Sequence, residues 1–476
     1  MTMRATRTHF ATAPCWPRIA TLAAAIALAA SAHENACADA RVRDVPQAQL
    51  FVTNCDDSGP GSLRDTIAGA ASGDMIDLSE LTCSTITLTS GAIEIPQDDL
   101  YIKYSGEGGT PPTIDGNSAS RVFHHTGAGT LRIVGLTITH GKYDNADAYY
   151  VTSATGGCIY SAGSVYLAGS TVTACTARDT RGEDAAGGAV YASGSLTLDH
   201  ATLSSSTAYS SSRFADGGGA FAHGAVYASY SEIGANSTSG LLGGFGGGLA
   251  VVNAAATEST IASSTIDGNT AQQDGGGLFV SGIGNSGSAL SLANSTISGN
   301  TVTAGYAAAA YVLGPLEITA STVAFNDSSG VALALGSAAY PVAIASSILA
   351  DNHAGTFDDD IGAYGGTLTI TGSHDLIIDA EPSIVLPGDT IGAEPLLEPL
   401  ADNGGATRTH ALADGSPALD AGDNDAGLSF DQRGNGFARV AGTAADIGAF
   451  ERQASTDTIF ADGFDGGMRE ADGAVR

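Results

Sequence analysis

Short runs of alternating apolar and small polar residues recur along most of the chain, separated by Gly, Asn and Ser. One motif, Gly-Gly followed by an apolar run, begins at residues 156, 187, 218, 247 and 276. A second motif is an apolar residue flanked by Ser or Thr, found at Ile138, Val172, Leu203, Ile233, Ile266, Ile297, Val323 and Ile348. A third alternating segment lies between them, as at 164–167 and 289–292. The second motif returns every 25–34 residues.

This pattern predicts strands, because short β-branched and aromatic runs bounded by turn residues are typical of them. No window keeps a helical spacing of apolar residues. A repeat of this length with three short strands predicts an all-β, single-stranded right-handed parallel β-helix. We expect about eight or more coils, stacked about 4.8 Å apart, with a cap at each end.

The repeated Gly and Asn residues each suggest a place in the coil. We expect the Gly pairs at tight corners, where one coil approaches the next. We expect equivalent positions after them to stack in one column, formed by Ile159, Val190, Phe221, Ala250 and Phe279. The Asn residues that follow the second motif are Asn236, Asn269, Asn300 and Asn326. An internal ladder of amide groups is the expected role of these Asn residues, with ligand binding as the alternative.

The N-terminus has the pattern of a secretory signal peptide. Residues 1–18 contain three Arg and no acid, residues 19–30 are apolar or small, and Ala30-Ser31-Ala32 follows. Cleavage is expected near Ala32 or after Ala40. Twelve apolar residues are too few to span a membrane, so we expect a mature chain without a transmembrane segment, outside the cell or on its outer surface.

Export permits disulfides. We predict that Cys55 pairs with Cys83 and that Cys158 pairs with Cys175. The alternative is that these cysteines are small buried hydrophobic residues.

The amino-acid composition argues against nucleic acid as a partner and against a disordered chain. The chain has 476 residues, 64 of them Gly, and a net charge of −31. A chain this acidic repels a phosphate backbone, so nucleic-acid binding is not expected. An apolar content of 43% is too high for an acidic disordered chain.

The segments at both ends of the repeat resemble known families. Cys55 and the run 61–67 (GSLRDTI) resemble the CSLREA-type domain that precedes secreted β-helices, although here the cysteine lies further upstream and Thr66 replaces Ala. The blocks PLADNGGATRTHAL, GSPALDAG, DQRGNGFAR and DIGAFE, spread over 399–451, resemble the choice-of-anchor Q region of bacterial secreted proteins. With the Gly-Gly repeats, which look like those of polymorphic outer-membrane proteins, the resemblance implies the pectin-lyase-like superfamily, whose fold hosts enzymes and non-enzymes.

The organisation that follows has six parts. They are a signal peptide at 1–32, a linker at 33–50, an N-terminal cap with the first coils at 51–125, β-helix repeats at 126–380, a C-terminal anchor-like cap at 381–453 and a tail at 454–476.

The sequence lacks the residue blocks that catalysis on this fold uses. No Lys or Arg stands between Arg213 and Arg408, where a lyase would need a base. We therefore predict a non-catalytic, adhesin-like interaction protein that binds a glycan or a protein. The alternative is a polysaccharide lyase or glycoside hydrolase of the same superfamily.

The longest loops after the second motif, at about 139–155, 174–186 and 204–216, contain most basic residues of the coils. Mixed charge with Tyr suits recognition of glycans or proteins, and ion-paired surface loops are the alternative. The predicted ligand-binding residues are Lys142, Tyr143, Asp144, Tyr149, Tyr150, Arg178, Asp179, Arg181, Tyr209 and Arg213.

Two acidic clusters, Asp358–Asp360 and 420–425, present dense oxygen ligands. Calcium is the ion that such ligands would take, and Asp358, Asp359 and Asp360 are the predicted site. Solvated acidic loops are the alternative, in which case the chain has no cofactor.

Overall fold

The structure is a computed structural model. It describes residues 48–106, 109–145, 153–253, 257–282, 287–354 and 359–453, so the signal-peptide segment and the tail lie outside it. The chain divides into one unit of Met1–Asp44 with Asp425–Gly427 and a second of Val45–Asn424 with Leu428–Arg476. The fold belongs to the second unit.

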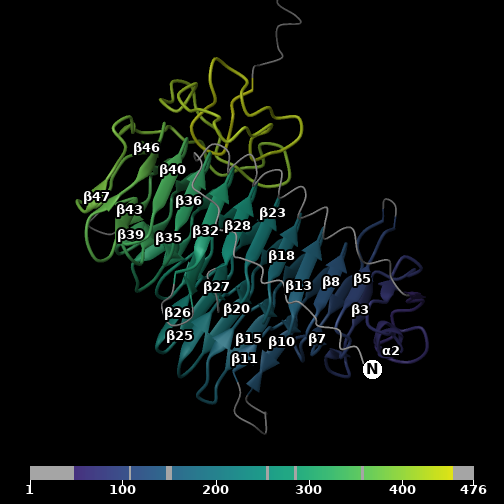
Figure 1. The fold of residues 1–476 in the computed structure, drawn as a ribbon. Coiled ribbons are helices and arrows are strands. Elements are labelled where there is room, and N and C mark those ends of the chain that lie inside the picture. The colour runs from purple at the N-terminus through teal and green to yellow at the C-terminus, as the bar shows by residue number, and fades with distance from the viewer. Residues whose placement is uncertain are drawn as a thin grey trace, which may run out of the picture. The chain divides into compact units, whose positions relative to one another are not determined.

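The second unit is an all-β parallel β-helix, as the sequence predicts (Figure 1). In each large sheet, neighbouring strands come from consecutive coils, and the register between them is parallel throughout the named pairs. Ten coils contribute a strand to the 10-stranded sheet. No helix among the described residues is long and apolar enough to cross a membrane.

Two sheets run the length of the stack. The 12-stranded sheet contains β1 (Gln49–Phe51), β2 (Met75–Asp77), β5 (Leu100–Lys103), β8 (Thr130–Val134), β13 (Ser164–Ala168), β18 (Leu196–Asp199), β23 (Val226–Ser229), β28 (Glu258–Ala262), β32 (Ala289–Ala293), β36 (Leu316–Thr319), β40 (Val342–Ala345) and β45 (Thr371–Ser373). The 11-stranded sheet contains β3 (Thr85–Thr87), β6 (Thr113–Asp115), β9 (Thr137–Thr139), β14 (Thr171–Thr173), β19 (Thr202–Ser204), β24 (Glu232–Gly234), β29 (Thr265–Asp267), β33 (Thr296–Ser298), β37 (Thr322–Ala324), β41 (Ile348–Ala350) and β46 (Leu376–Ile377).

The remaining sheets complete the coils. The 10-stranded sheet contains β4 (Ile93–Ile95), β7 (Phe123–His125), β12 (Ile159–Ser161), β17 (Val190–Ala192), β22 (Ala220–Ala222), β27 (Leu249–Asn253), β31 (Leu278–Gly282), β35 (Ala307–Val312), β39 (Val331–Leu335) and β43 (Ile361–Ala363). The 8-stranded sheet contains β10 (Lys142–Asp144), β15 (Thr176–Asp179), β20 (Thr207–Ser210), β25 (Ser237–Gly240), β30 (Thr270–Ala271), β34 (Thr301–Val302), β38 (Asp327–Ser328) and β42 (His353–Ala354). The 4-stranded sheet contains β11 (Ala154–Thr155), β16 (Ala185–Ala186), β21 (Phe214–Asp216) and β26 (Gly243–Phe245), and β44 (Leu368–Thr369) pairs with β47 (Ile384–Val385).

A short helix, α2 (Leu63–Ala68), packs against the first coils. The hydroxyl of Ser62 caps it by accepting a hydrogen bond from the backbone N–H of Asp65. Leu63 and Ile67 are buried in the main core. Disulfides join Cys55 to Cys83 and Cys158 to Cys175, which confirms both predicted pairs.

The Asn residues form a ladder inside the coils, as expected. Each amide nitrogen donates to the amide oxygen of the next Asn, for example Asn269 Nδ2 to Asn300 Oδ1 at 2.9 Å. The same oxygen accepts a backbone N–H at 3.0 Å, so the ladder ties side chains to the corner backbone of successive coils. It runs through Asn236, Asn269, Asn300, Asn326 and Asn352. These groups are buried and paired with one another, so they are not free to bind a ligand.

A second buried ladder, of Ser residues, lies directly before the strands of the 11-stranded sheet, whereas the Asn residues follow these strands. Each Ser hydroxyl accepts a backbone N–H from the preceding coil and donates to the carbonyl two residues before it. Its members are Ser231, Ser264, Ser295, Ser321 and Ser347. Both ladders end on a buried carboxyl group: Asn352 donates to Asp360, and the N–H of Ser347 donates to Asp375.

Stability is expected to fall as pH rises. Burial, the largest cause, raises the pKa of Asp360 and of Asp375 to about 7 each. The folded chain thus keeps two protons that the unfolded chain releases near pH 4, so this stabilisation is full at low pH and lost as pH rises through 7. Each carboxyl should contribute on the order of 3 kcal/mol to the difference in unfolding free energy between about pH 5 and about pH 8.

Urea unfolding at the two pH values measures this difference. Asp360→Asn and Asp375→Asn should each make stability less dependent on pH. Glu80→Gln removes an exposed carboxylate and controls for the general loss of charge repulsion. If all three variants change the pH dependence equally, the ladder ends are not its source.

The Gly pairs lie at corners, as predicted. The first Gly of each group has φ between +62° and +68°, a conformation that favours glycine; these residues are Gly156, Gly187, Gly217, Gly246 and Gly275. The next Gly touches the adjacent coil. A Cβ on Gly188 would lie 2.1 Å from the carbonyl oxygen of Gly218. Only glycine lets the stacked backbones approach this closely.

The segment after the last coil folds back onto the outer face of the 11-stranded sheet. The side chain of Gln432 donates to Thr265 Oγ1 at 2.8 Å and accepts from Thr296 Oγ1 at 2.6 Å. Arg408 pairs with Glu232 and Asp267, which are outward residues of β24 and β29. This segment, predicted as an end cap, thus also covers the side of the later coils.

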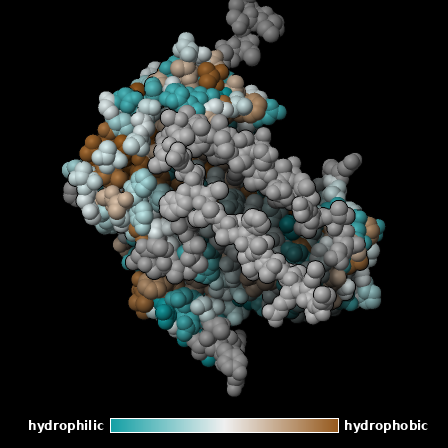
Figure 2. All heavy atoms as spheres, viewed as in Figure 1, coloured by the Kyte–Doolittle hydropathy of each residue, from teal (hydrophilic) through white to brown (hydrophobic). Residues whose placement is uncertain are grey.

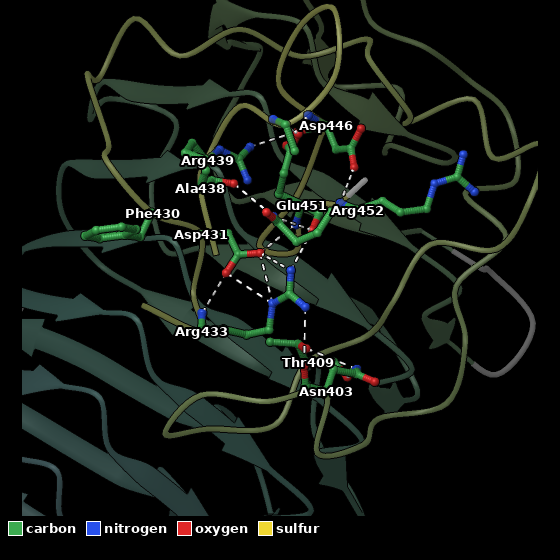
Figure 3. A network of polar contacts seen from close by, with 12 residues as sticks. Asn403, Thr409, Phe430, Asp431, Arg433, Ala438, Arg439, Asp446, Glu451 and Arg452 are labelled. Atoms are coloured by element: carbon green, nitrogen blue, oxygen red, sulfur yellow. Dashed lines mark hydrogen bonds and ion pairs between the residues drawn. The ribbon is translucent and has the colours of Figure 1, made fainter. Parts of the chain in front are cut away.

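Buried charges hold the segment together (Figure 3). Arg433 donates through Nε to both carboxylate oxygens of Asp431, at 3.2 and 3.0 Å. Its guanidinium lies 3.9 Å from the ring centroids of both Phe437 and Phe450. Arg439 is fully buried and donates to the carbonyls of 446 and 448. The four sequence blocks of this region therefore contribute to one network of side chains and backbone.

Candidate functional site

Four of the predicted ligand-binding residues meet on the outside of the 8-stranded sheet. Asp144, Arg178 and Tyr209 are in register on β10, β15 and β20. Asp144 Oδ2 lies 3.2 Å from Arg178 Nη1 and 3.6 Å from Lys142 Nζ. The guanidinium of Arg178 lies 5.7 Å from the centre of the Tyr209 ring. These residues form an exposed charged ladder that already pairs its own charges.

The other predicted residues lie elsewhere. Asp179 is buried, and its Oδ1 accepts the backbone N–H groups of Arg181, Gly182 and Glu183, which fixes the turn after β15. Tyr143 is half-buried beneath the guanidinium of Arg121, 3.5 Å from its ring centre. These side chains support the fold and do not face outward.

Arg213 lies at the turn before β21, where its Nε donates to Asp184 at 3.1 Å. Tyr149 and Tyr150 lie outside the described residues.

The three residues predicted to bind calcium do not form one described cluster of ligands. Asp360 ends the internal Asn ladder and also accepts the backbone N–H of Asp379. Asp358 lies outside the described residues, so calcium binding there stays a prediction. Within the part of the chain that the structure describes, no three His, Cys, Asp or Glu side chains gather as a metal site.

A column of aromatic rings runs along the outside of the 10-stranded sheet. Its members, in register, are Tyr160, Tyr191, Phe221, Ala250, Phe279 and Tyr311. The rings of Tyr160 and Tyr191 stack at 5.4 Å between centroids with an interplanar angle of 3°. The rings of Tyr191 and Phe221 stack at 5.4 Å and 4°, and those of Phe279 and Tyr311 at 5.3 Å and 12°.

This register corrects the predicted column. Ile159 and Val190 align with Ala220, not with Phe221, and they belong to the core. The corners at 217–219, 246–248 and 275–277 each contain three Gly, and the left-handed turn is at the first of them. The predicted alignment started from the second Gly, and a one-residue shift exchanges the two faces of a strand. The aromatic residues therefore face outward.

The 4-stranded sheet meets the 10-stranded sheet at an inner corner. Ala186, which faces outward on β16, packs with Phe221 and Ala250 of the aromatic column. Since outward side chains of both sheets touch, the surface is concave here. The residues directly before each left-handed Gly stack through backbone hydrogen bonds, and they are Thr155, Ala186, Asp216, Phe245 and Asp274. We call this column and the facing aromatic column the aromatic corner.

Carboxyl groups face the rings in this corner. Asp216 is in register with Ala186 and Phe245, and among the described residues its Oδ1 is shielded from solvent without a hydrogen-bond partner. Burial and then the charge of Asp184 raise the pKa of Asp216 to about 7. Burial and the charge of Asp274 raise the pKa of the Tyr311 hydroxyl. The corner thus combines apolar ring surface with negative potential.

A buried cation closes the first end of the corner. Arg121 donates to the carbonyls of Thr155 and Gly156, both at 3.0 Å from Nε. Its guanidinium also lies 5.3 Å from the centre of the Tyr160 ring. Burial lowers the pKa of Arg121 to about 10, and its hydrogen bonds go to backbone and ring, so it is a structural cation.

Exposed leucines border the corner at the turn between β25 and β26. Leu241 and Leu242 are 71% and 52% exposed, and Figure 2 shows apolar surface beside these strands. Phe214 lies one coil earlier, with its ring centroid 6.0 Å from that of Phe245. Apolar surface therefore continues outward from the aromatic corner.

Comparisons with known proteins assign neither a family nor an activity to this chain. No family model and no curated protein matches the chain. Among solved structures, the chain is similar to the one described as the crystal structure of pectate lyase Pel9A, with a TM-score of 0.45 and 14% identity over 86% of this chain and 98% of that chain. At this identity and TM-score, the likeness says nothing about what this chain does.

Proposed function

We propose that this chain is an exported, non-catalytic β-helix protein that binds a glycan along its aromatic corner. Its N-terminal signal-peptide pattern and its two disulfides support a place outside the cell or on its outer surface. The observation that carries the proposal is the aromatic corner, where two pairs of half-buried rings, Tyr160 with Tyr191 and Phe279 with Tyr311, lie in register on either side of the buried Phe221 and Ala250. Such amphipathic rings give apolar contact and a polar tip to a sugar. Its regular spacing suits an extended polymer.

The charges near the corner disfavour a lyase. Such an enzyme uses a Lys or Arg side chain as the base that accepts the proton, and the chain has no Lys or Arg from 214 to 407. The nearest described cations, Arg121 and Arg213, are held by backbone carbonyls and by Asp184. Both guanidinium groups already bond to groups of the protein itself.

One observation favours a second candidate, a glycoside hydrolase. The carboxyl of Asp216, with a pKa of about 7, has the protonation state that a general acid needs, and Asp184 acts on it electrostatically. Incubation with neutral and charged polysaccharides separates the two functions. Release of reducing ends that Asp216→Asn abolishes would replace the binding proposal with a hydrolase.

Loss of one ring should weaken binding. Tyr191→Ala removes the ring stacked between Tyr160 and Phe221, and we expect the Kd for a bound polysaccharide to rise about 5- to 10-fold. Tyr227→Ala removes an exposed Tyr of the 12-stranded sheet and should leave the Kd unchanged. A glycan array followed by calorimetry measures both, and Tyr191→Phe, which keeps the stack, guards against a folding defect. Equal Kd values for Tyr191→Ala, Tyr227→Ala and the parent would refute the role of the aromatic corner.

The charged ladder gives a separate test. If Arg178→Ala or Arg213→Ala lowers affinity and Tyr191→Ala does not, the ligand lies on the 8-stranded sheet and its turns instead.

A further inference from the structure

The charges around the aromatic corner indicate which glycan it takes. Asp216 and Asp274 stand in one column with Phe245 between them, and Asp184, in the turn before β16, accepts the backbone N–H of Phe214 on β21. Glu381 lies at the far end, where its carboxylate accepts from the hydroxyl of Tyr306. The chain offers no Lys or Arg in coils after Arg213 to offset these acids. Beyond its first end, where Arg121 lies over Tyr160, the corner is therefore lined by acids without a cation to offset them.

The carboxyl group of Asp216 lacks a hydrogen-bond donor among the described residues. No described hydrogen bond reaches either of its oxygens, and Oδ1 is shielded from solvent. The residue as a whole is half-buried. A buried acceptor without a donor is unfavourable by about 1–3 kcal/mol, and a ligand that supplies an N–H or O–H removes that cost.

Carboxylates beside aromatic rings form the environment that ammonium groups prefer. A cation is attracted by the ring quadrupole and by the carboxylate at once, and both attractions grow where water is displaced. A polyuronate would instead bring carboxylates against Asp216 and Asp274. Repulsion between like charges at this range excludes such a ligand.

From these contacts we infer that the aromatic corner selects a polysaccharide with free amino groups, such as a chain of glucosamine units. The inference rests on the proposed function, since it names the ligand of the same site. The sugar rings lie on the edges of the aromatic column, and their ammonium groups face Asp216 and Asp274. Binding requires no metal and no bond cleavage.

Calorimetry on the full mature chain tests the inference with three hexasaccharides: glucosamine, N-acetylglucosamine and galacturonate. We expect the glucosamine chain to bind at least about 10-fold more tightly than its N-acetylated counterpart, which keeps the rings and removes the charge. Added salt should weaken this preference. Galacturonate should not bind.

Variants locate the effect. Asp216→Asn and Asp274→Asn should each lower the affinity for the glucosamine chain more than the affinity for the N-acetylated chain, so that the preference between the two falls. Glu258→Gln removes one exposed charge of β28 and controls for attraction to an acidic protein in general. An equal loss in Glu258→Gln would overturn the inference.

The outcomes also separate the inference from the proposed function. Equal or tighter binding of the N-acetylated or galacturonate chain would overturn the ligand class and keep glycan binding. A screen in which no glycan binds would overturn both.

Discussion

Replacing Arg433 with Ala is expected to lower the unfolding free energy of the C-terminal segment by about 3–5 kcal/mol. The change leaves the carboxylate of Asp431 buried without its counter-charge; Asp431 is fully shielded and Arg433 nearly so. It also removes the cation between the rings of Phe437 and Phe450. Hydrogen exchange in 393–453 and urea unfolding measure the loss.

The control is another Arg–Asp pair of the same segment. Arg452 meets Asp414 at 2.6 Å, but Asp414 is fully exposed. Arg452→Ala should therefore change stability by less than about 1 kcal/mol. Equal destabilisation by both variants would show that charge, and not burial, sets the effect.

Replacing Gly188 with Ala is expected to destabilise the coils by about 3 kcal/mol or more. The added Cβ would meet the carbonyl oxygen of Gly218 at 2.1 Å and the carbonyl carbon of Thr207 at 2.5 Å. Both contacts are backbone atoms, one in the next coil and one across the same coil, so no side chain can move aside. Thermal and urea unfolding of the variant measure the loss.

Gly388→Ala is the matched control, since nothing lies within 4 Å of its Cβ and its φ is not in the left-handed region. It should be neutral or slightly stabilising, because Ala restricts the unfolded chain. A Gly188→Ala protein as stable as the parent would mean that the coil spacing relaxes at this corner.

The sequence alone was sufficient to predict the coil, because its information is periodic. Repeated Gly pairs, alternating strands and spaced Asn residues specify corners, faces and an internal ladder without any long-range knowledge. The pairing of Cys158 with Cys175 follows similarly, since the two cysteines are close along one coil. Such features depend on local chemistry that repeats.

The aromatic corner was not predicted, for two physical reasons. The corners at 217–219, 246–248 and 275–277 each hold three Gly, and the sequence does not say which of the three takes the left-handed turn. A shift of one residue placed Phe221 and Phe279 in the core column. The concave contact between Ala186 and Phe221 also depends on the turn angle between two sheets, which no single coil encodes. The signal that was present is Tyr at both 160 and 191, one repeat apart.

The C-terminal segment that folds back along the stack limits where coils can be added or lost. The coils before Glu232 can vary in number, and the coils that the segment contacts cannot. The segment forms hydrogen bonds with outward residues of particular coils, which are Glu232, Thr265, Thr296 and Thr322. A coil inserted between these residues would move the later ones by one coil spacing, and the C-terminal segment could no longer bond to all of them. A coil added before Glu232 would lengthen the rod and leave every one of these contacts in place. The number of coils can thus change in the N-terminal half of the stack, while the number in the C-terminal half is fixed by these contacts.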